Sequence, residues 1–294
     1  MGVDFLDNNV EKITSSTALN KLKRKIPYGW DLNIYRGCSH KCKYCYALYS
    51  NDFLGENNFS KVFAKTNIAE QLDKELSSPK WKREIINIGG VTDSYQKAEG
   101  EMKIMPEVLK VLIKHKTPAI ISTKSDLILR DFDLIAELSK LTYVNVASTI
   151  TTMNEEDRKK IEPNGSPSLE RFKMLKEFRK TSASVGLHTM PIIPYITDSY
   201  FNVESLCSEA KRSNVHYMLP GVLYLRGVTR KVFFEFIKDQ YSDKYENMKE
   251  LYKKGGADKS YKEKLYNEIV NPLREKYGIS KSYIKPLKEK MHKD

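Results

Sequence analysis

The 294-residue sequence contains no apolar run close to the roughly 20 residues that a membrane-spanning helix needs, and it has only four cysteines. We therefore expect no membrane partner. The amino-terminal residues turn polar and acidic soon after the first methionine, so we expect no secretory signal. Few cysteines and no signal argue against a disulfide scaffold and favour a protein of the reducing cytoplasm.

The overall composition is that of a soluble globular protein, with 40% hydrophobic and 30% charged residues. The length allows one large or two small domains with a sizeable core. A net charge of +12 favours contact with the phosphate backbone of a nucleic acid. A solvated lysine-rich surface is the alternative, because the lysines are spread along the chain.

Three of the four cysteines, Cys38, Cys42 and Cys45, lie within the segment Cys-Ser-His-Lys-Cys-Lys-Tyr-Cys. Three thiolates this close in sequence can hold three irons of a [4Fe–4S] cube and leave the fourth iron open. A closed cluster needs four thiolates and a structural zinc needs four ligands, so zinc with His40 as the fourth ligand is the alternative. Cys207 falls in a predicted helix, where we expect it to be buried packing.

Strand-like and helix-like segments alternate over most of the chain, which predicts about six βα units in succession. Such units form a parallel sheet with right-handed crossovers, and their regular spacing favours a partial (β/α)6 TIM-type barrel. The predicted strands are 32–35, 84–88, 119–123, 143–148, 184–190 and 216–225, and the predicted helices are 68–76, 106–115, 131–140, 168–180 and 203–212.

The alternation stops near residue 228, and two further segments, 232–252 and 261–277, have helical patterns. We therefore divide the chain into an irregular arm (1–29), a barrel (30–228) and a C-terminal α-helical extension (229–294). The chemistry of a βα barrel lies at the carboxyl ends of its strands. The cysteine segment directly follows the first predicted strand, which is where such a site is expected.

The spacing Cys-x3-Cys-x2-Cys, with an aromatic residue before the last cysteine, resembles the signature of the radical S-adenosylmethionine (SAM) superfamily. Several segments narrow the resemblance to the spore photoproduct lyase-like branch of that superfamily. They are Asn-Ile-Tyr-Arg-Gly-Cys-Ser-His at 33–40, Thr-Asp-Ser-Tyr-Gln-Lys-Ala-Glu at 92–99, Ser-Thr-Lys-Ser-Asp-Leu-Ile-Leu-Arg-Asp at 122–131 and Pro-Ile-Ile-Pro at 191–194. The resemblance covers roughly residues 30–225.

This resemblance implies an enzyme whose three cysteines bind a [4Fe–4S] cluster while the amino and carboxylate groups of SAM chelate the fourth iron. An electron from the cluster, delivered by a donor such as flavodoxin or ferredoxin, then cleaves SAM to a 5′-deoxyadenosyl radical that abstracts hydrogen from a substrate. Tyr44 would lie beside the adenine, and Lys124 would pair with the SAM carboxylate. A surface lysine is the alternative for Lys124.

The remaining SAM contacts are also implied by the resemblance. A glycine-rich stretch after the second strand binds the SAM amino group in the superfamily, and here it comprises Gly89, Gly90, Val91 and Thr92. Ser148 and Thr149 would contact the ribose or methionine end, and Met190 and Ile192 would line the adenine pocket. The structural alternatives are a turn for the glycine-rich stretch, a strand-end cap for Ser148 and Thr149, and core packing for Met190 and Ile192.

The substrate is less constrained by the sequence. Spore photoproduct lyases carry an extra cysteine just after the second strand that returns a hydrogen atom, and this chain has Gly-Gly-Val-Thr-Asp there. A lyase reaction in DNA repair is therefore not implied, although a nucleic acid stays the first expectation. The alternatives are a radical SAM enzyme acting on a peptide or small metabolite, and a non-enzymatic metal-stabilised nucleic-acid-binding protein.

A tyrosine could replace the missing cysteine as a hydrogen relay. Tyr95 and Tyr224 lie near predicted strand ends, but eighteen tyrosines make any choice weak. Arg130, Asp131 and Glu162 are expected to form structural ion pairs near the mouth of the barrel, and Arg130 could alternatively meet an anionic substrate.

Overall fold

A computed structural model describes residues 10–23, 28–48 and 61–283. Its main sheet has seven strands in the order β10-β9-β8-β7-β6-β3-β2, and β10 and β2 lie at its two ends. All neighbouring pairs from β3 to β10 are parallel, which confirms the partial barrel of six parallel strands, and β2 is antiparallel to β3. The strands are β2 (Leu19–Lys21), β3 (Trp30–Leu32), β6 (Ile86–Ile88), β7 (Ala119–Thr123), β8 (Val144–Thr149), β9 (Ser184–Ile192) and β10 (Tyr217–Val222).

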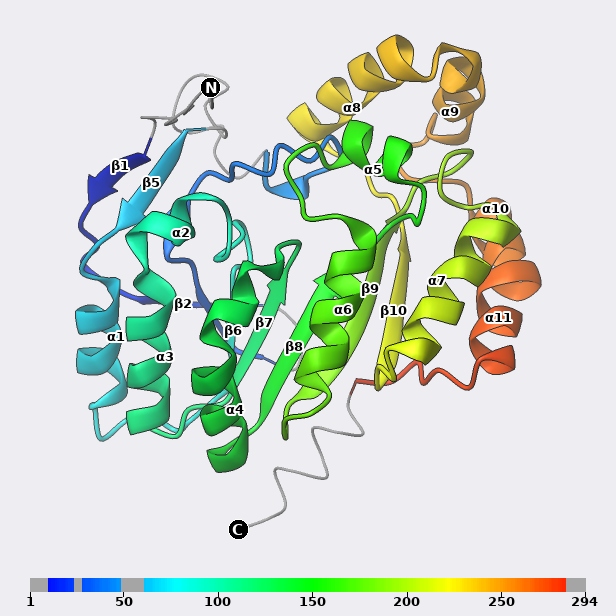
Figure 1. Cartoon of the computed structure of the whole chain (residues 1–294). Coiled ribbons are helices and arrows are strands. Elements are labelled where there is room, and N and C mark those ends of the chain that lie inside the picture. The colour runs from blue at the N-terminus through cyan, green and yellow to red at the C-terminus, as the bar shows by residue number, and fades with distance from the viewer. Residues whose placement is uncertain (1–9, 24–27, 49–60, 284–294) are drawn as a thin grey trace, which may run out of the picture.

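The strands form because their β-branched residues fall at alternate positions and are buried under the helices. Helices α1 (Ile68–Leu76), α3 (Ile104–Lys114), α4 (Phe132–Leu141), α6 (Ser168–Phe178) and α7 (Tyr200–Arg212) cover this outer face of the sheet (Figure 1). The outward residues Ile86, Ile88, Ile121, Val144, Val146, Val185 and Leu187 are all fully buried.

The inner face of the sheet is more polar, because Asn87, Asn145 and His188 occupy the alternate positions. Gly186 leaves room on this face for the ring of Tyr217 on the next strand. A Cβ at Gly186 would lie 2.1 Å from Tyr217 Cζ, so no other residue fits there. The Tyr217 hydroxyl donates to Asn145 Oδ1 at 2.9 Å and thereby closes the floor of the barrel.

The amino-terminal segment differs from our expectation. The expected strand 32–35 is divided, because the chain leaves the main sheet after Leu32 and enters a second sheet as β4 (Tyr35–Arg36). That sheet has the order β1-β5-β4 and also contains β1 (Val10–Ile13) and β5 (Val62–Lys65). Since β1 and β2 both pair with other strands, an irregular arm is wrong for the described part of residues 1–29.

A buried carboxylate joins the second sheet to the helical layer. Glu99, at 0% exposure, accepts from the Tyr35 hydroxyl at 2.5 Å and from Arg130 Nη2 at 2.6 Å. Arg130 also donates to Asp131 at 2.9 Å and 2.8 Å, as expected for a structural pair. Glu99 lies in α2 (Ala98–Met102), a short helix that the sequence did not predict.

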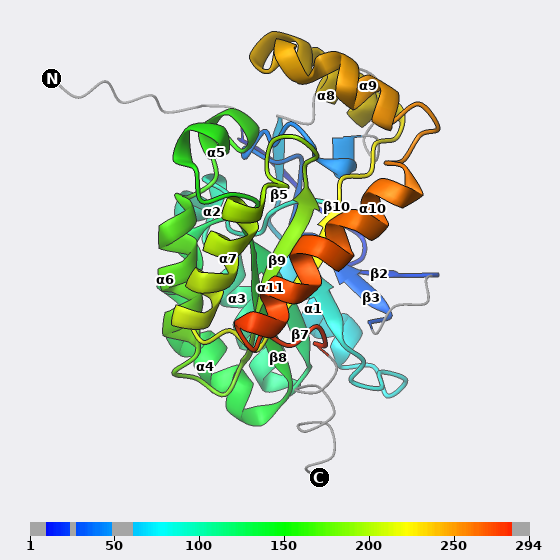
Figure 2. The same ribbon diagram turned by 90° about the vertical axis from the view of Figure 1, so that its right-hand side faces the viewer.

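After β10 the chain is helical, as predicted. The first expected helix is divided at Tyr241 into α8 (Gly227–Gln240) and α9 (Tyr245–Leu251), which stand above the carboxyl ends of the strands (Figures 1 and 2). The second comprises α10 (Lys259–Leu265), a π-helical turn (Tyr266–Val270) and α11 (Asn271–Lys276). The boundaries of the three-part division stay a prediction. In the described part of the chain, no helix is long and apolar enough to cross a membrane.

Candidate active site

The cysteine loop lies at the carboxyl-end edge of the sheet, between the barrel and α8. Cys38 and Cys42 are each only 8% exposed, and Cys45 is half-buried. Cys38 packs with Val91 on the barrel side, whereas Cys42 packs in an apolar cluster that includes residues of α8. Burial raises the pKa of all three thiols, that of Cys38 to about 12.

Three of the four cysteines lie in this loop, and the fourth lies on α7. Within the described residues, no three His, Cys, Asp or Glu side chains converge closely enough to hold one metal ion. Cys207 is fully buried on α7, where its sulfur contacts Met218 Sδ at 3.8 Å, so it is packing, as expected.

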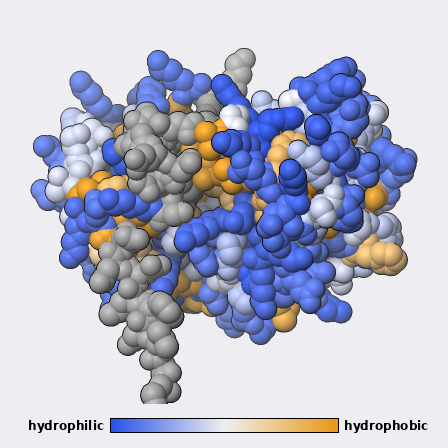
Figure 3. Space-filling model, turned by 90° about the horizontal axis from the view of Figure 1, so that it is seen from above, coloured by the Kyte–Doolittle hydropathy of each residue, from blue (hydrophilic) through white to orange (hydrophobic). Residues whose placement is uncertain are grey.

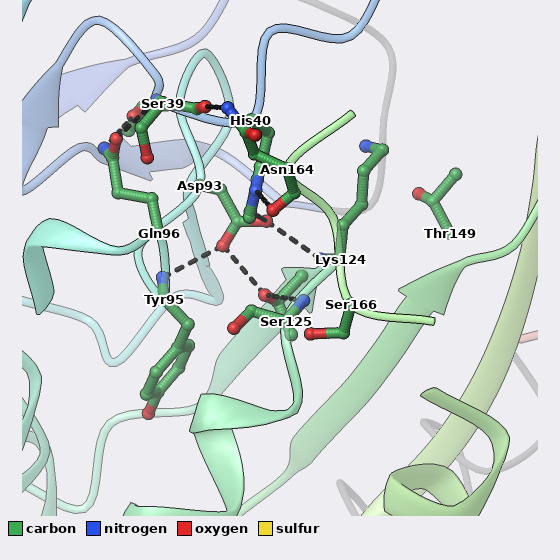
Figure 4. Close-up of polar contacts among 12 residues, drawn as sticks. Ser39, His40, Asp93, Tyr95, Gln96, Lys124, Ser125, Thr149, Asn164 and Ser166 are labelled. Atoms are coloured by element: carbon green, nitrogen blue, oxygen red, sulfur yellow. Dashed lines mark hydrogen bonds and ion pairs between the residues drawn. The ribbon is translucent and has the colours of Figure 1, made fainter. Parts of the chain in front are cut away.

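Asp93 connects the cysteine loop to two strand ends (Figure 4). Its carboxylate accepts from Thr123 Oγ1 and from Lys124 N, both at 2.8 Å, and lies 3.0 Å from His40 Nε2. Burial would raise the pKa of Asp93, but the charge and hydrogen bond of His40 hold it well below its ordinary value. The Asp93 and His40 backbones also donate to the Cys38 sulfur.

His40 bridges a third segment. Its Nδ1 lies 2.9 Å from the Asn164 carbonyl oxygen, and Asn164 Nδ2 donates to the Ser39 carbonyl at 2.6 Å. Gln96 accepts from Ser39 N at 2.7 Å on the opposite side. The loop between Cys38 and Cys42 is therefore fixed by polar contacts at both flanks, and His40 is a structural element of the loop.

Lys124 extends from the end of β7 toward the cysteines. Its Nζ lies 5.8 Å from the centroid of the Tyr44 ring. Burial lowers the pKa of Lys124, but the negative charges of Cys42 and Glu162 raise it above its ordinary value. Lys124 is therefore a retained cation, which is the state that pairs with a carboxylate.

Glu162 holds the middle of the cysteine loop. It is fully buried, accepts from the Tyr44 hydroxyl, and pairs with Arg171 Nη1 at 2.5 Å. Burial would raise the pKa of Glu162, but the charges of Arg171 and then Lys124 keep it below its ordinary value. Lys43 N also donates to the Ile161 carbonyl at 2.9 Å, so Lys43 and Tyr44, the two residues between Cys42 and Cys45, are both anchored in this region.

The glycine-rich segment follows β6 directly beside the cysteine loop. Gly89 has a φ of 83°, and a Cβ at Gly90 would lie 2.7 Å from Asp31 Oδ2, so both positions require glycine. The Val91 N–H donates to Asn33 Oδ1 at 3.0 Å. Thr92 Oγ1 donates to the Gly37 carbonyl at 2.6 Å, which ties this segment to the residue before Cys38.

The predicted SAM-binding residues on β8 and β9 lie in different environments. The Ser148 hydroxyl is fully buried and donates to the Thr123 carbonyl at 2.8 Å, whereas Thr149 is half-buried. Met190 is 40% exposed beside Gly221, and Ile192 belongs to the core. Roles of these residues in binding SAM stay predictions.

The two candidate relay tyrosines occupy opposite environments. Tyr95 is fully buried, and its ring points away from Lys124 (Figure 4). Tyr224 is 66% exposed on the segment between β10 and α8, beside Gly256. Neither observation assigns a relay role to them.

Sequence reasoning missed His188, which faces the barrel interior at the level of Thr149. Its Nε2 lies 3.4 Å from the Tyr217 hydroxyl. Burial and then the charge of Lys124 lower the pKa of His188 to about 4, so the ring is neutral at physiological pH. Its period-two position on a strand next to Gly186 was the signal that could have identified it.

Comparisons with known proteins assign the family. The Radical SAM superfamily model matches residues 32–203, which include the three cysteines, the glycine-rich segment and Lys124. The chain belongs to the radical SAM superfamily. Enzymes of this superfamily use a [4Fe–4S] cluster and SAM, and generally need a reductant such as flavodoxin or ferredoxin.

Related proteins align with nearly the whole length of this chain. An uncharacterized Mycobacterium tuberculosis protein is 32% identical over 92% of this chain and 81% of its own length. A Methanocaldococcus jannaschii protein is 26% identical over 90% of this chain and 96% of its own. These alignments extend past the range of the family match.

Solved structures of spore photoproduct lyase share the fold. One mutant has a TM-score of 0.64 at 9% identity over 91% of this chain and 79% of its own. Another, with bound AdoMet and dinucleoside spore photoproduct, has a TM-score of 0.60 at 11% identity over 77% of this chain. The chain spans 66% of that second structure, just under two thirds.

The residues fit the cofactors of the superfamily. Two buried thiols and one half-buried thiol lie in one loop, and the fourth cysteine is occupied in packing on α7, so the cysteines leave one iron corner of a cube without a thiolate. The raised pKa values of Cys38, Cys42 and Cys45 describe thiols without metal, and binding of iron would release their protons. Lys124 supplies a cation within the same site.

We expect Asp93→Asn to destabilise the metal-free chain by about 2–4 kcal/mol, because it removes a buried acceptor from hydrogen-bonded partners and the charge facing His40. Urea unfolding measures this change. Asp243→Asn is the control, because Asp243 is 72% exposed and pairs only with its neighbour Lys244 at 2.7 Å. Equal losses in both variants would contradict the role of Asp93.

The depressed pKa of His188 predicts a pH effect. Below its ordinary pKa of 6.5 the unfolded chain takes up a proton that the folded chain does not take up until about pH 4. The free energy of unfolding should therefore fall with decreasing pH through this window, by roughly 2–3 kcal/mol more than in His188→Asn. Parallel pH curves for the two proteins, measured by urea unfolding, would refute a buried neutral imidazole.

Proposed function

We propose that this enzyme cleaves SAM reductively at a [4Fe–4S] cluster bound by Cys38, Cys42 and Cys45, and abstracts hydrogen from a substrate in or resembling a nucleic acid. The observation that carries the proposal is the convergence of the three thiols, the strand end 89–92 and Lys124 at one edge of the barrel. Asp93 directly follows the strand end 89–92, contacts His40 of the cysteine loop and accepts from the Lys124 backbone.

When bound, the cluster supplies the electron that splits SAM into methionine and a 5′-deoxyadenosyl radical. The protein's own contribution is to bind, orient and exclude water. Lys124 offers its ammonium to the SAM carboxylate, and the main chain at Gly89 and Gly90 can approach a ligand closely because neither residue has a side chain. Thr149 and the neutral His188 line the adjoining interior of the barrel.

Three observations support a nucleic acid as the substrate class. The chain carries a net charge of +12. Tyr46 and Tyr224 are 53% and 66% exposed near the cysteine loop, and exposed Arg226 lies two residues after Tyr224. Aromatic and cationic side chains together suit stacking on bases and contact with phosphates. Seen from above, the molecule is largely hydrophilic with small hydrophobic patches (Figure 3).

The structural neighbour with a bound dinucleoside photoproduct adds to this support through its shared fold. The segment 89–93 has no cysteine that could return hydrogen to a product, so we do not propose thymine-dimer repair. Membership in the superfamily supports an enzyme, which leaves no reason to propose the non-enzymatic alternative.

Anaerobic reconstitution with iron and sulfide, followed by dithionite and SAM, should yield 5′-deoxyadenosine measurable by chromatography. Cys42→Ala should abolish it by removing an iron ligand. Lys124→Met should weaken SAM binding roughly tenfold, since a hydrogen bond to a charged group contributes about 1.5–3 kcal/mol. Lys110→Met, on the exposed side of α3, is the control. A reconstituted wild type that forms no 5′-deoxyadenosine would overturn the proposed reaction.

Binding of a single-stranded oligonucleotide should weaken steeply with salt. Tyr46→Ala and Tyr224→Ala should each weaken it about fivefold or more, because stacking on one base contributes about 1–3 kcal/mol. Phe201→Ala is the control, since Phe201 is 79% exposed on α7. Fluorescence anisotropy measures all four proteins. Absence of binding at low salt, with 5′-deoxyadenosine still formed, would favour a peptide or small metabolite as substrate.

A further inference from the structure

Helix α8 lies outside residues 32–203, the range that the family model matches, yet it contacts the cysteine loop directly. The Thr229 hydroxyl, in the first turn of α8, donates to the Cys45 carbonyl oxygen at 2.9 Å. Thr229 is 1% exposed, so this hydrogen bond is protected from water. The last cysteine of the loop is therefore fastened to a helix that begins 182 residues later.

The aromatic face of α8 continues this contact. Cys42 and Tyr44 belong to one buried apolar cluster with Phe233 and Phe236 of α8. Phe233 is fully buried, and its ring lies 6.1 Å from that of Phe236. Cys42 is therefore packed in an apolar cluster to which α8 contributes aromatic side chains.

The helix is braced by α5 (Glu155–Ile161), which also contacts the cysteine loop. The Tyr241 hydroxyl, at the end of α8, donates to Asp157 Oδ1 of α5 at 2.7 Å, and Lys160 lies 5.2 Å from the centroid of the Tyr241 ring. The Ile161 carbonyl at the end of α5 accepts from Lys43 N of the cysteine loop at 2.9 Å. The cysteine loop therefore contacts both α5 and α8, and these two helices also contact each other.

We propose that α8 is one wall of the cluster site, in which Thr229 positions the Cys45 end of the loop and Phe233 excludes water from the Cys42 side. This inference rests on the proposed cluster ligands. Reduction adds a negative charge to a cluster, and a water-free surrounding disfavours that charge. The wall therefore keeps the reduction potential low, as cleavage of a sulfonium requires, and slows attack by oxygen.

Two variants of the full chain test the wall after anaerobic reconstitution. Thr229→Val keeps the shape and removes the hydroxyl, and Phe233→Ala opens the apolar cover. We expect both to lose visible cluster absorption roughly tenfold faster in air, because loss of partners around metal ligands typically weakens metal binding by about tenfold or more. Phe233→Ala should also raise the potential measured by EPR titration. Thr229→Ser, which keeps the hydroxyl, should behave as the wild type.

The controls remove similar groups far from the loop. Thr181→Val deletes a hydroxyl that donates to the Phe178 carbonyl at 2.7 Å, and Phe178→Ala opens a cavity beneath α6. Neither should change the bleaching rate or the potential. A wild type that binds no cluster would overturn the ligands and the wall together. A wild type with cluster, whose lability and potential stay unchanged in both test variants, would overturn the wall alone.

Discussion

The buried carboxylate of Asp93 is the constraint on which the geometry of this site depends. Three elements that are distant in the sequence meet at this side chain: the cysteine loop through His40, the turn after β6 through its own backbone, and the end of β7 through Thr123 and Lys124. A carboxylate that is withdrawn from water remains ionised only when hydrogen bonds and positive charge compensate it. Asp93 receives both, so the groups around it are held in a fixed arrangement.

Around this centre the cysteines occupy two environments. Cys38 lies on the barrel side, where backbone N–H groups of His40 and Asp93 donate to its sulfur. Cys42 lies in one apolar cluster with aromatic residues of α8, and the nearby Tyr44 reaches the buried pair of Glu162 and Arg171. Hydrogen bonds to sulfur and exclusion of solvent are two of the factors that set the potential of an iron–sulfur cluster. Here the hydrogen bonds come from the barrel side and the exclusion of solvent comes from the C-terminal helices.

The sequence predicted the fold correctly where the local hydrophobic pattern determines the secondary structure. The strand 119–123 matches β7 because its residues alternate between fully buried and half-buried positions, and the helix 68–76 matches α1 because its apolar residues recur at helical spacing. The second sheet was not predictable, because β1 and β4 are short and are defined only by pairing with β5, which lies far along the sequence. Local pattern contains no information about such partners.

The candidate site was likewise predictable only in part. The spacing of the cysteines indicated a cluster loop, but the function of His40 and Glu162 depends on contacts with residues more than 50 positions away. His188 shows no motif at all, and only the barrel geometry places it beside the predicted SAM contacts.

The most direct test of the central claim is EPR spectroscopy of the anaerobically reconstituted and reduced protein, with and without SAM. The account predicts the signal of a reduced [4Fe–4S] cluster whose shape changes when SAM is added, because one iron has no protein thiolate. A mononuclear metal, or a cluster signal that SAM leaves unchanged, would contradict it.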